Sequence, residues 1–340
     1  PYDISWNFQI QRQLPADSLF SIGYVGSRGL NLYNNLLLNQ LSDSALAQGN
    51  ALLKLVANPF YGKISSGILS NAKIAEGQLL RPFPQFDTMT ADDATWASST
   101  YHALQVEYEK RFSHGFNLTA SYTWSKLMDN TTGAFNGQPL SGTAYQDYHN
   151  LRAEWAVSAL DLPQRFVVGY MWELPFGPGK RFAAGGVLGR VVGGWQMGGI
   201  TTLQTGEILG VTDTTNTTFS NGGGQRPNWN GVNPAIGNPA IGRWFNTDVF
   251  SQPASFTFGS APRTFASLHA DPVRNFDFSL IKNTKISERL SLQFRAEFFN
   301  LFNTVQFAPP DTTFNTPNFG AVTSQLNQPR IIQFALKLLF

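Results

Sequence analysis

Residues 291–298 read Ser-Leu-Gln-Phe-Arg-Ala-Glu-Phe, so every second side chain is apolar and those between are polar or charged. A period of two indicates a β-strand with one apolar and one polar face. The same alternation is clear in residues 4–11, 116–125 and 331–340 and weaker in residues 19–27, 102–112, 165–174, 195–204 and 275–283. The sequence therefore predicts nine strands of about 9–11 residues, a length typical of strands that cross a membrane.

The connections between these predicted strands alternate in length. The short connections are residues 14–18, 113–115, 175–194 and 284–290, and the long ones are residues 28–101, 126–164, 205–274 and 300–329. Compact soluble domains rarely contain several loops this long. Outer-membrane barrels combine short periplasmic turns with long extracellular loops. The predicted fold is all-β, an antiparallel transmembrane β-barrel segment with long extracellular loops.

One face of the predicted strands is polar and the other is apolar, as expected for strands that separate a water-filled lumen from lipid. Polar and charged residues on the face expected to line a wet lumen are Gln105, Glu107, Glu109, Arg295 and Glu297. Charges in the lipid-facing register occur only near strand ends, where a charged side chain costs little; they are Arg12, Lys110, Lys282 and Arg330. Aromatic residues expected at the membrane boundaries are Trp6, Tyr24, Tyr108, Trp124, Tyr170, Trp172 and Trp195.

The composition excludes several classes of protein. Charged residues make up 14% of the 340 residues and aromatic residues another 14%, which is opposite to the signature of disorder. No stretch of 18 or more apolar residues predicts a membrane-spanning helix. A net charge of +2 gives no reason to expect nucleic acid as a partner. The absence of cysteine excludes disulfides and thiolate metal sites and fits an extracytoplasmic location.

The sequence contains no recognisable catalytic or metal-binding pattern. The four histidines, His102, His114, His149 and His269, do not have the spacing of zinc ligands. Asp92 and Asp93 lack the surrounding pattern of a calcium loop, and no Gly-x-Ser-x-Gly motif is present. We expect no enzymatic activity, no cofactor and no metal.

Aromatic residues in the predicted long loops are the candidate ligand-binding residues. They are Trp96, Tyr145, Tyr148, Trp155, Trp229 and Trp244. Exposed rings of this kind can stack on a sugar or anchor a protein ligand. The alternative interpretation is that the long loops use these rings to form small cores of their own.

Several segments resemble the TonB-dependent outer-membrane transporters, and within that family the Oar-like group. The most specific is FDFSLIKNTKISERLSLQFRAEFFNLFNTVQF (residues 276–307), which resembles the penultimate hairpin of such receptors. Residues 21–32, 174–182 and 194–209 also resemble the family. The final IIQFALKLLF (residues 331–340) resembles a barrel-assembly signal, so Phe334, Leu336, Leu338 and Phe340 are expected to be recognised by the barrel-assembly machinery.

The resemblance implies a 22-stranded barrel that holds an N-terminal plug and is energised by the TonB system. Because only nine strands and no plug are visible, and the chain starts at Pro1, residues 1–340 are expected to be the C-terminal portion of such a receptor. The implied function is to move a bulky solute, a peptide or a protein across the bacterial outer membrane. The implied partners are membrane lipid, the assembly machinery, the TonB system through the missing plug, and an unknown solute or protein ligand.

Two other functions remain open at this stage. The loops could hold a partner in a binding or adhesion protein that transports nothing. The strands could instead form a secreted glycan-binding β-sandwich, because sandwich strands also alternate. In a sandwich, however, charged residues would normally dominate the solvent face.

Overall fold

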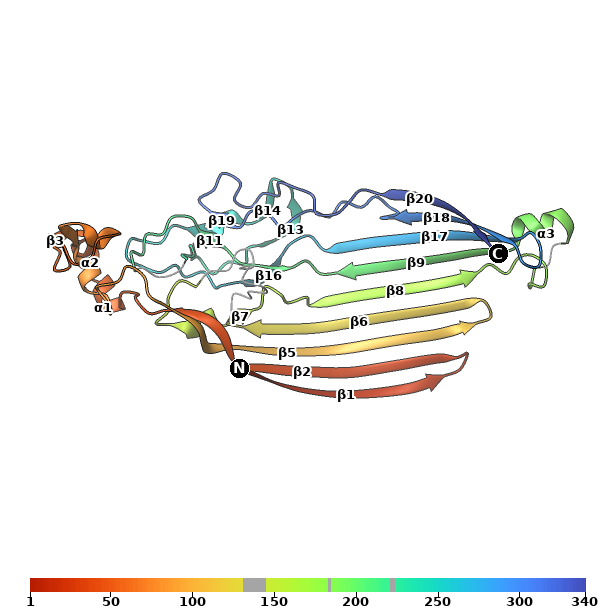
Figure 1. The fold of residues 1–340 in the computed structure, drawn as a ribbon, viewed down its shortest axis with the longest axis horizontal. Helices are drawn as coiled ribbons and strands as arrows, with labels where there is room; N and C mark the ends of the chain where they lie inside the picture. The colour runs from red at the N-terminus through yellow and green to blue at the C-terminus, as the bar shows by residue number, and fades with distance from the viewer. Residues whose placement is uncertain (131–144, 183–184, 221–223) are drawn as a thin grey trace.

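The computed structural model describes residues 1–130, 145–182, 185–220 and 224–340 of the chain. Nine long strands form one antiparallel sheet in which neighbours in the sequence are neighbours in space (Figure 1). They are β1 (Tyr2–Leu14), β2 (Ser18–Leu37), β5 (Thr90–Ser113), β6 (Phe116–Asp129), β8 (Gln164–Glu173), β9 (Trp195–Gln204), β17 (Val273–Lys285), β18 (Ser291–Phe299) and β20 (Ile331–Leu339). Each corresponds to one of the nine strands predicted from alternation, so the all-β, antiparallel class is confirmed.

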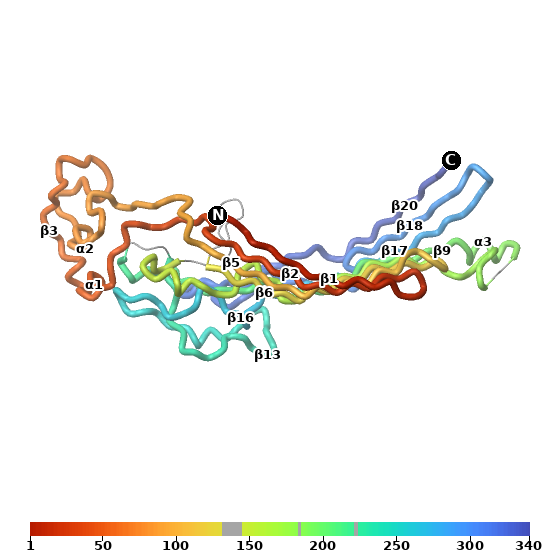
Figure 2. The backbone as a smooth tube through the Cα atoms, turned by 90° about the horizontal axis from the view of Figure 1, so that it is seen from below, coloured from red at the N-terminus to blue at the C-terminus, as the bar shows by residue number. Residues whose placement is uncertain are grey.

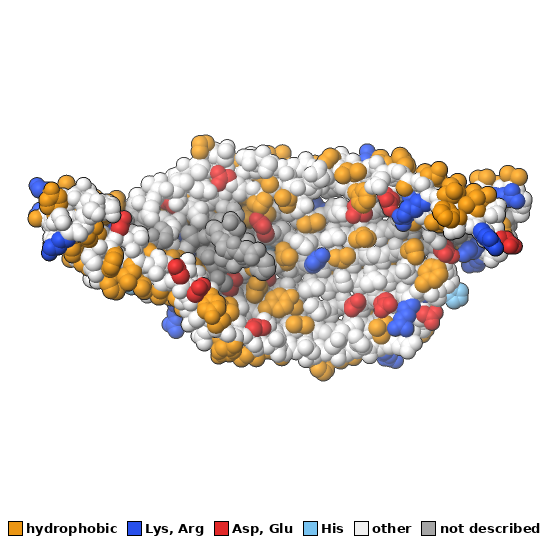
Figure 3. Space-filling model, viewed as in Figure 1, with side chains coloured by type: hydrophobic (Ala, Val, Ile, Leu, Met, Phe, Trp, Pro, Cys, Tyr) orange, Lys and Arg blue, Asp and Glu red, His pale blue; other side chains and the backbone are white. Residues whose placement is uncertain are grey.

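The register of the strand pairs keeps all apolar alternations on one face. Phe294 lies opposite Leu336 of β20 and Lys282 of β17, and Phe278 lies opposite Phe298 and Gly199. The intervening residues share the other face, where Glu297 lies opposite Ser279 and Gln333. Figure 3 shows a face on which scattered acidic and basic side chains lie among uncharged ones over the strands. One apolar and one polar face therefore continue across all nine strands.

Two strands are much longer than the prediction of about 9–11 residues. β2 has 20 residues and β5 has 24, because the two strands continue to pair beyond the regular sheet as far as Leu37 and Thr90. Irregularities between Gly29 and Leu32 and between Asn34 and Leu36 shift the register in this extension. A shift in register interrupts the period of two. The strands predicted from alternation were therefore shorter than β2 and β5.

The long connections lie at one end of the sheet and the short ones at the other (Figure 1). The short connections are residues 15–17, 114–115, 174–194 and 286–290. The third of them contains α3 (Gly186–Val192). Residues 38–89, 130–163, 205–272 and 300–330 form the long set. Figure 2 shows the sheet as a single curved layer, with residues 38–89 at the far tip of the molecule. This separation of long and short connections agrees with the prediction.

The long connections contain short elements of their own. Residues 38–89 contain α1 (Asp43–Leu46), η1 (Gly49–Leu53), β3 (Leu55–Ala57), η2 (Ile68–Ser70), β4 (Lys73–Ala75) and α2 (Glu76–Leu79). Residues 130–163 contain η3 (Leu151–Glu154) and β7 (Ala156–Val157), which pairs with β6. The remaining elements are β10 (Ile208–Leu209), β11 (Thr212–Asp213), β12 (Asn228–Trp229), β13 (Ala235–Ala240), β14 (Arg243–Phe245), η4 (Thr247–Val249), β15 (Phe250–Ser251), β16 (Phe265–His269) and β19 (Thr313–Phe314). The strand pairs among them are β3–β4, β10–β16, β12–β15, β13–β14 and the parallel pair β11–β19.

The hydrophobic core lies in these connections and not in the sheet. Its larger cluster includes Val211, Phe245, Phe265 and Leu268, all buried, and Val322 from the last long connection. A smaller cluster surrounds Leu41 and Leu52. The apolar face of the sheet stays exposed, as Phe8 and Leu336 show at 67% each. Apolar residues on an outward barrel face pack against lipid, so the sheet needs no protein core on that side.

The sheet is open in the part of the chain that the structure describes, with β1 and β20 as its two edges. Among the described residues, no helix is long and apolar enough to cross a membrane.

Candidate ligand-binding surface

Three of the six candidate aromatic residues come together where the β2–β5 extension meets the connection after β6. The ring of Tyr145 lies 5.3 Å from that of Trp96 and 5.9 Å from that of Tyr148, between ring centroids. The expectation that Trp96 lies in a loop was wrong, because the lengthened β5 includes it. The phenol of Tyr145 accepts a hydrogen bond from Asn34 at 2.5 Å and donates one to the carbonyl of Asn130 at 2.9 Å. The buried Tyr145 ring therefore joins β2, β5 and the end of β6.

The other three candidates differ in exposure. Trp244 is buried in the larger loop core, and its indole N–H donates to the carbonyl of His269 at 2.8 Å. Trp229 packs against the same core, edge-on to Phe265. These two rings match the alternative interpretation, in which loop aromatics build a core. Trp155 is 41% exposed and is the candidate most available to a ligand.

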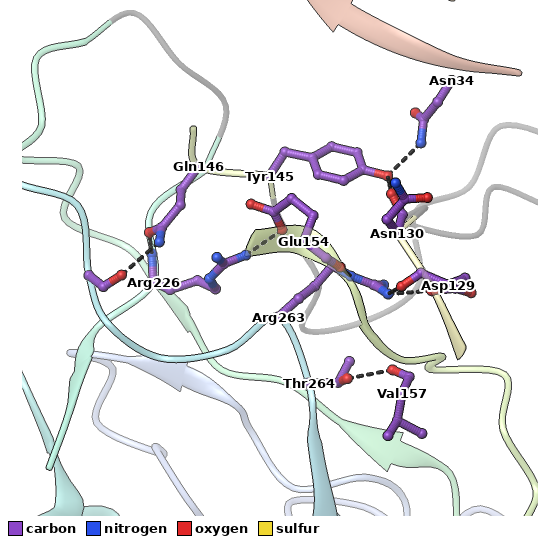
Figure 4. Close-up of polar contacts among 11 residues, drawn as sticks. Asn34, Asp129, Asn130, Tyr145, Gln146, Glu154, Val157, Arg226, Arg263 and Thr264 are labelled. Atoms are coloured by element: carbon purple, nitrogen blue, oxygen red, sulfur yellow. Dashed lines mark hydrogen bonds and ion pairs between the residues drawn. The ribbon is translucent and has the colours of Figure 1, made fainter. Parts of the chain in front are cut away.

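Two buried ion pairs connect the long loops beneath this aromatic cluster (Figure 4). Nη1 of Arg226 lies 2.6 Å from Oε2 of Glu154. Arg263 pairs with Asp129 at the end of β6 and donates to the carbonyl of Glu154 at 2.9 Å. All four side chains are at least 96% buried. Paired charges at this depth hold segments in one arrangement, because breaking a pair leaves a buried charge uncompensated.

Uncharged hydrogen bonds reinforce the same contact. Gln146 accepts from the backbone N–H of Arg226 at 3.1 Å and donates to the carbonyl of Gly259 at 2.7 Å. The hydroxyl of Thr264 donates to the carbonyl of Val157 at 2.5 Å. Residues 145–163 and 224–272 are therefore packed together as one unit over the end of β6 (Figure 4).

Two acidic groups in this unit, Tyr148 and Asp161, have raised pKa values. Burial, together with the charge of Glu154, raises the pKa of Tyr148 above its ordinary value. Burial also raises the pKa of Asp161, although the backbone N–H of Leu127 donates to its carboxylate at 2.7 Å. The second carboxylate oxygen of Asp161 is buried without a hydrogen-bond partner.

The polar face of the sheet contains a groove of about 530 Å³ between β6, β8, β9, β17 and β18. Gly169 and Gly198 leave space for it, and its polar lining includes Asn117, Gln196, Asp277, Arg295 and Glu297. Arg295 and Glu297 are thus on the polar face, as the sequence predicted. Apolar side chains such as Met171 and Ile200 complete the lining. Mixed linings of this kind are typical of sites for organic ligands.

The expected assembly signal occupies the last strand. Phe334, Leu336 and Leu338 lie on the apolar face of β20, opposite Ala296, Phe294 and Leu292. Phe340 follows the end of the strand and is fully exposed. Their recognition by an assembly machinery stays a prediction.

No group of three or more His, Asp or Glu side chains that could hold a metal ion occurs among the described residues. The four buried ion-pair residues were missed by the sequence analysis. Three of them lie in aperiodic loops, Asp129 lies at the very end of β6, and Glu154 and Arg226 are 72 residues apart, so no local pattern could reveal the pairs.

Comparison with known proteins identifies the type of domain. The model of the family described as "Outer membrane beta barrel domain" matches residues 1–333. The solved structures similar to the chain include the outer membrane transporter YddB from Escherichia coli, with a TM-score of 0.45, 7% identity and coverage of 99% of this chain and 32% of that one. Another is the pyoverdine outer membrane receptor FpvA from Pseudomonas aeruginosa PAO1 bound to pyoverdine, with a TM-score of 0.40, 9% identity and coverage of 99% and 30%. The chain spans about a third of the length of these structures. No curated protein matches it.

Proposed function

Because the chain belongs to the outer membrane β-barrel domain family, we propose that it forms part of the wall and the surface loops of a transporter or receptor. In this proposal the loops bind a bulky solute, a peptide or a protein at the cell surface, and the ligand then passes along the polar face of the sheet. No bond is made or broken in the process. The location of the protein is the bacterial outer membrane.

One observation carries this proposal, namely the polar groove on the inward face of the sheet. A wall whose only task is to anchor loops needs an apolar outer face but no shaped, mixed surface inside. Asp277, Arg295 and Glu297 provide charges of both signs along the groove. The folded loops at the end of the sheet, joined by buried ion pairs, provide a rigid surface for the first contact.

Dependence on the TonB system is a further part of the proposal. It is supported by the resemblance of residues 276–307 to the penultimate hairpin of TonB-dependent transporters of the Oar-like group. On this basis the chain contributes the last nine strands of a barrel of 22 strands, and a plug elsewhere in the full protein contacts TonB. The barrel-assembly machinery would recognise β20, and lipid would cover the apolar face.

The proposal is tested by comparing the solutes that cells remove from their medium. We would grow cells with the full-length protein, cells without it, and cells without TonB, and measure the spent media by mass spectrometry. A TonB-dependent transporter predicts at least one solute that only the unmodified cells deplete. A solute that remains depleted without TonB would contradict TonB dependence. Identical media in all three would favour the alternative, a binding or adhesion protein.

A further inference from the structure

The charges on the apolar, lipid-facing side of the sheet all have one sign. Within the regularly paired strands, the acidic residues Asp3, Glu107, Glu109, Asp129, Glu173, Asp277 and Glu297 are all in the inward register. The charged residues in the outward register are Arg12, Arg28, Lys110, Lys126, Arg274 and Lys282. Every charged side chain on the lipid-facing side of the regularly paired strands is therefore basic.

The lysines of the short-turn end bind protein carbonyls, whereas Arg12 at that end and the cations of the long-loop end are exposed. At the short-turn end, Lys110 donates to the carbonyl of Ala16 at 2.8 Å and Lys282 to that of Arg190 at 2.7 Å, so both ammonium groups bind the turns themselves. At the long-loop end, Arg28 and Lys126 are exposed. Arg274 donates one hydrogen bond, at 3.2 Å to Asp271, and its side chain remains 54% exposed. The long-loop end thus presents cations to the outer leaflet.

Arg274 lies at the edge of an apolar groove on this outward face. Tyr122, Phe166 and Leu203 lie directly opposite one another in successive strands, and Arg274 is the next residue in the same row. These four residues, with Pro272 and Val273, line a groove of about 640 Å³. The groove runs between β6, β8, β9 and β17 at their extracellular ends. Its apolar part is continuous with the surface that contacts lipid chains.

We propose that this groove binds one phosphate-bearing lipid of the outer leaflet, with an acyl chain over Phe166 and Leu203 and a phosphate on Arg274. A guanidinium group has five N–H donors and matches the geometry of a phosphate. Asp271 accepts one of these bonds and holds the guanidinium at the mouth of the groove. Basic residues at a membrane surface attract anionic headgroups, and no outward acidic residue among the regular strand pairs opposes them.

Native mass spectrometry of the full-length protein in detergent tests this proposal. The probes are an acylated glucosamine disaccharide with two phosphates, the same lipid with its phosphates removed, and inorganic phosphate alone. We expect the phosphorylated lipid to bind more tightly than its phosphate-free form. Arg274→Gln should weaken the phosphorylated lipid about fivefold, the amount expected for one cation near a membrane surface, and should leave the phosphate-free lipid unchanged.

Three matched variants complete the test. Arg274→Lys keeps the charge and should retain most of the binding, and Phe166→Ser should weaken both lipids because it removes apolar contact. Arg12→Gln removes an outward cation at the opposite end and should have no effect. Heat-modifiable migration in gels shows whether each variant is folded. Equal binding of both lipids, an unaltered affinity in a folded Arg274→Gln variant, an equal loss in Arg12→Gln, or displacement of the lipid by inorganic phosphate would each overturn the proposal.

Discussion

Glu154 and Arg226 form an ion pair of 2.6 Å in which both side chains are almost completely buried. The pair joins two long connections, residues 130–163 and 205–272, that follow different strands of the sheet. Together with Arg263 and Asp129 it fixes the loops over the end of β6. The loops that would meet a ligand first are therefore held in one arrangement by buried ion pairs.

Loss of one member of a buried pair should destabilise the loops strongly. We predict that Arg226→Ala lowers the free energy of unfolding of the loop unit by about 3–5 kcal/mol, because Glu154 would stay buried without its partner. Limited proteolysis of the full-length protein in membranes measures this as faster cleavage within residues 145–163.

The control is Arg243→Ala, which breaks the exposed pair with Asp248 and should cost only about 0–1 kcal/mol. The double variant Glu154→Met with Arg226→Met should restore much of the protection, since it leaves no unpaired charge. Equal cleavage of the Arg226→Ala and Arg243→Ala variants would show that the buried pair does not hold the loops.

A charge placed on the outward face should destabilise the protein in a membrane, and the same charge on the inward face should be tolerated. Phe278 and Ser279 are neighbours at the middle of β17 but lie on opposite faces. Phe278→Arg should cost about 2–4 kcal/mol in lipid, whereas Ser279→Arg should cost much less. Refolding into lipid vesicles, followed by denaturant titration, measures both. A larger loss for Ser279→Arg would reverse the assignment of the two faces.

Asp161 should make the loop unit less stable as the pH rises. Its folded-state pKa is raised by burial above the ordinary value of 3.8, so the folded protein binds the proton more tightly than the unfolded chain. The resulting stabilisation is complete below about pH 3.8 and is lost as the pH rises through the raised pKa.

Asp161→Asn should remove this dependence and increase protection from protease at pH 7, because an amide oxygen can still accept the Leu127 N–H without carrying a charge. Rates of cleavage between pH 4 and pH 8 measure the difference between the two proteins. A variant that is less protected than the unmodified protein at pH 7 would contradict this account.

Deletion of Phe340 from the full-length protein should lower the amount of folded barrel in the outer membrane. The physical reason is that Phe340 directly follows β20, whose apolar face, with Phe334, Leu336 and Leu338, is exposed for recognition. Phe340→Tyr keeps an aromatic side chain at this position and serves as the control. Unchanged levels of heat-modifiable protein after the deletion would exclude this role.

Much of the sheet could be predicted from the sequence because its signal is local. Leu292, Phe294 and Ala296 alternate with polar residues on a strand whose two faces meet lipid and water. The prediction failed where the backbone is irregular. The register shifts after Gly29 interrupt the alternation, so the sequence predicted a loop at Trp96, which lies in β5.

The loop unit could not be predicted, because its contacts are long-range. The pairing of Arg263 with Asp129 spans 134 residues. Asp129 is the last residue of β6, beyond the alternation of residues 116–125, and Arg263 lies in a loop, so the sequence pattern does not show that either is buried. The burial of Trp244 follows from the same packing. Aromatic residues in loops are equally compatible with a core and with a ligand site, so composition alone could not separate Trp244 from the exposed Trp155.

The central claim is that each strand has one face in lipid and one in water, and β18 allows its most direct test. Because the chain contains no cysteine, single cysteines at positions 292 to 297 can carry a spin label in the full-length protein in lipid vesicles. Collisions with oxygen report lipid, and collisions with a water-soluble nickel chelate report water. The account predicts that Leu292, Phe294 and Ala296 meet oxygen while Gln293, Arg295 and Glu297 meet the chelate. Access of the chelate to all six positions would contradict a membrane-spanning sheet.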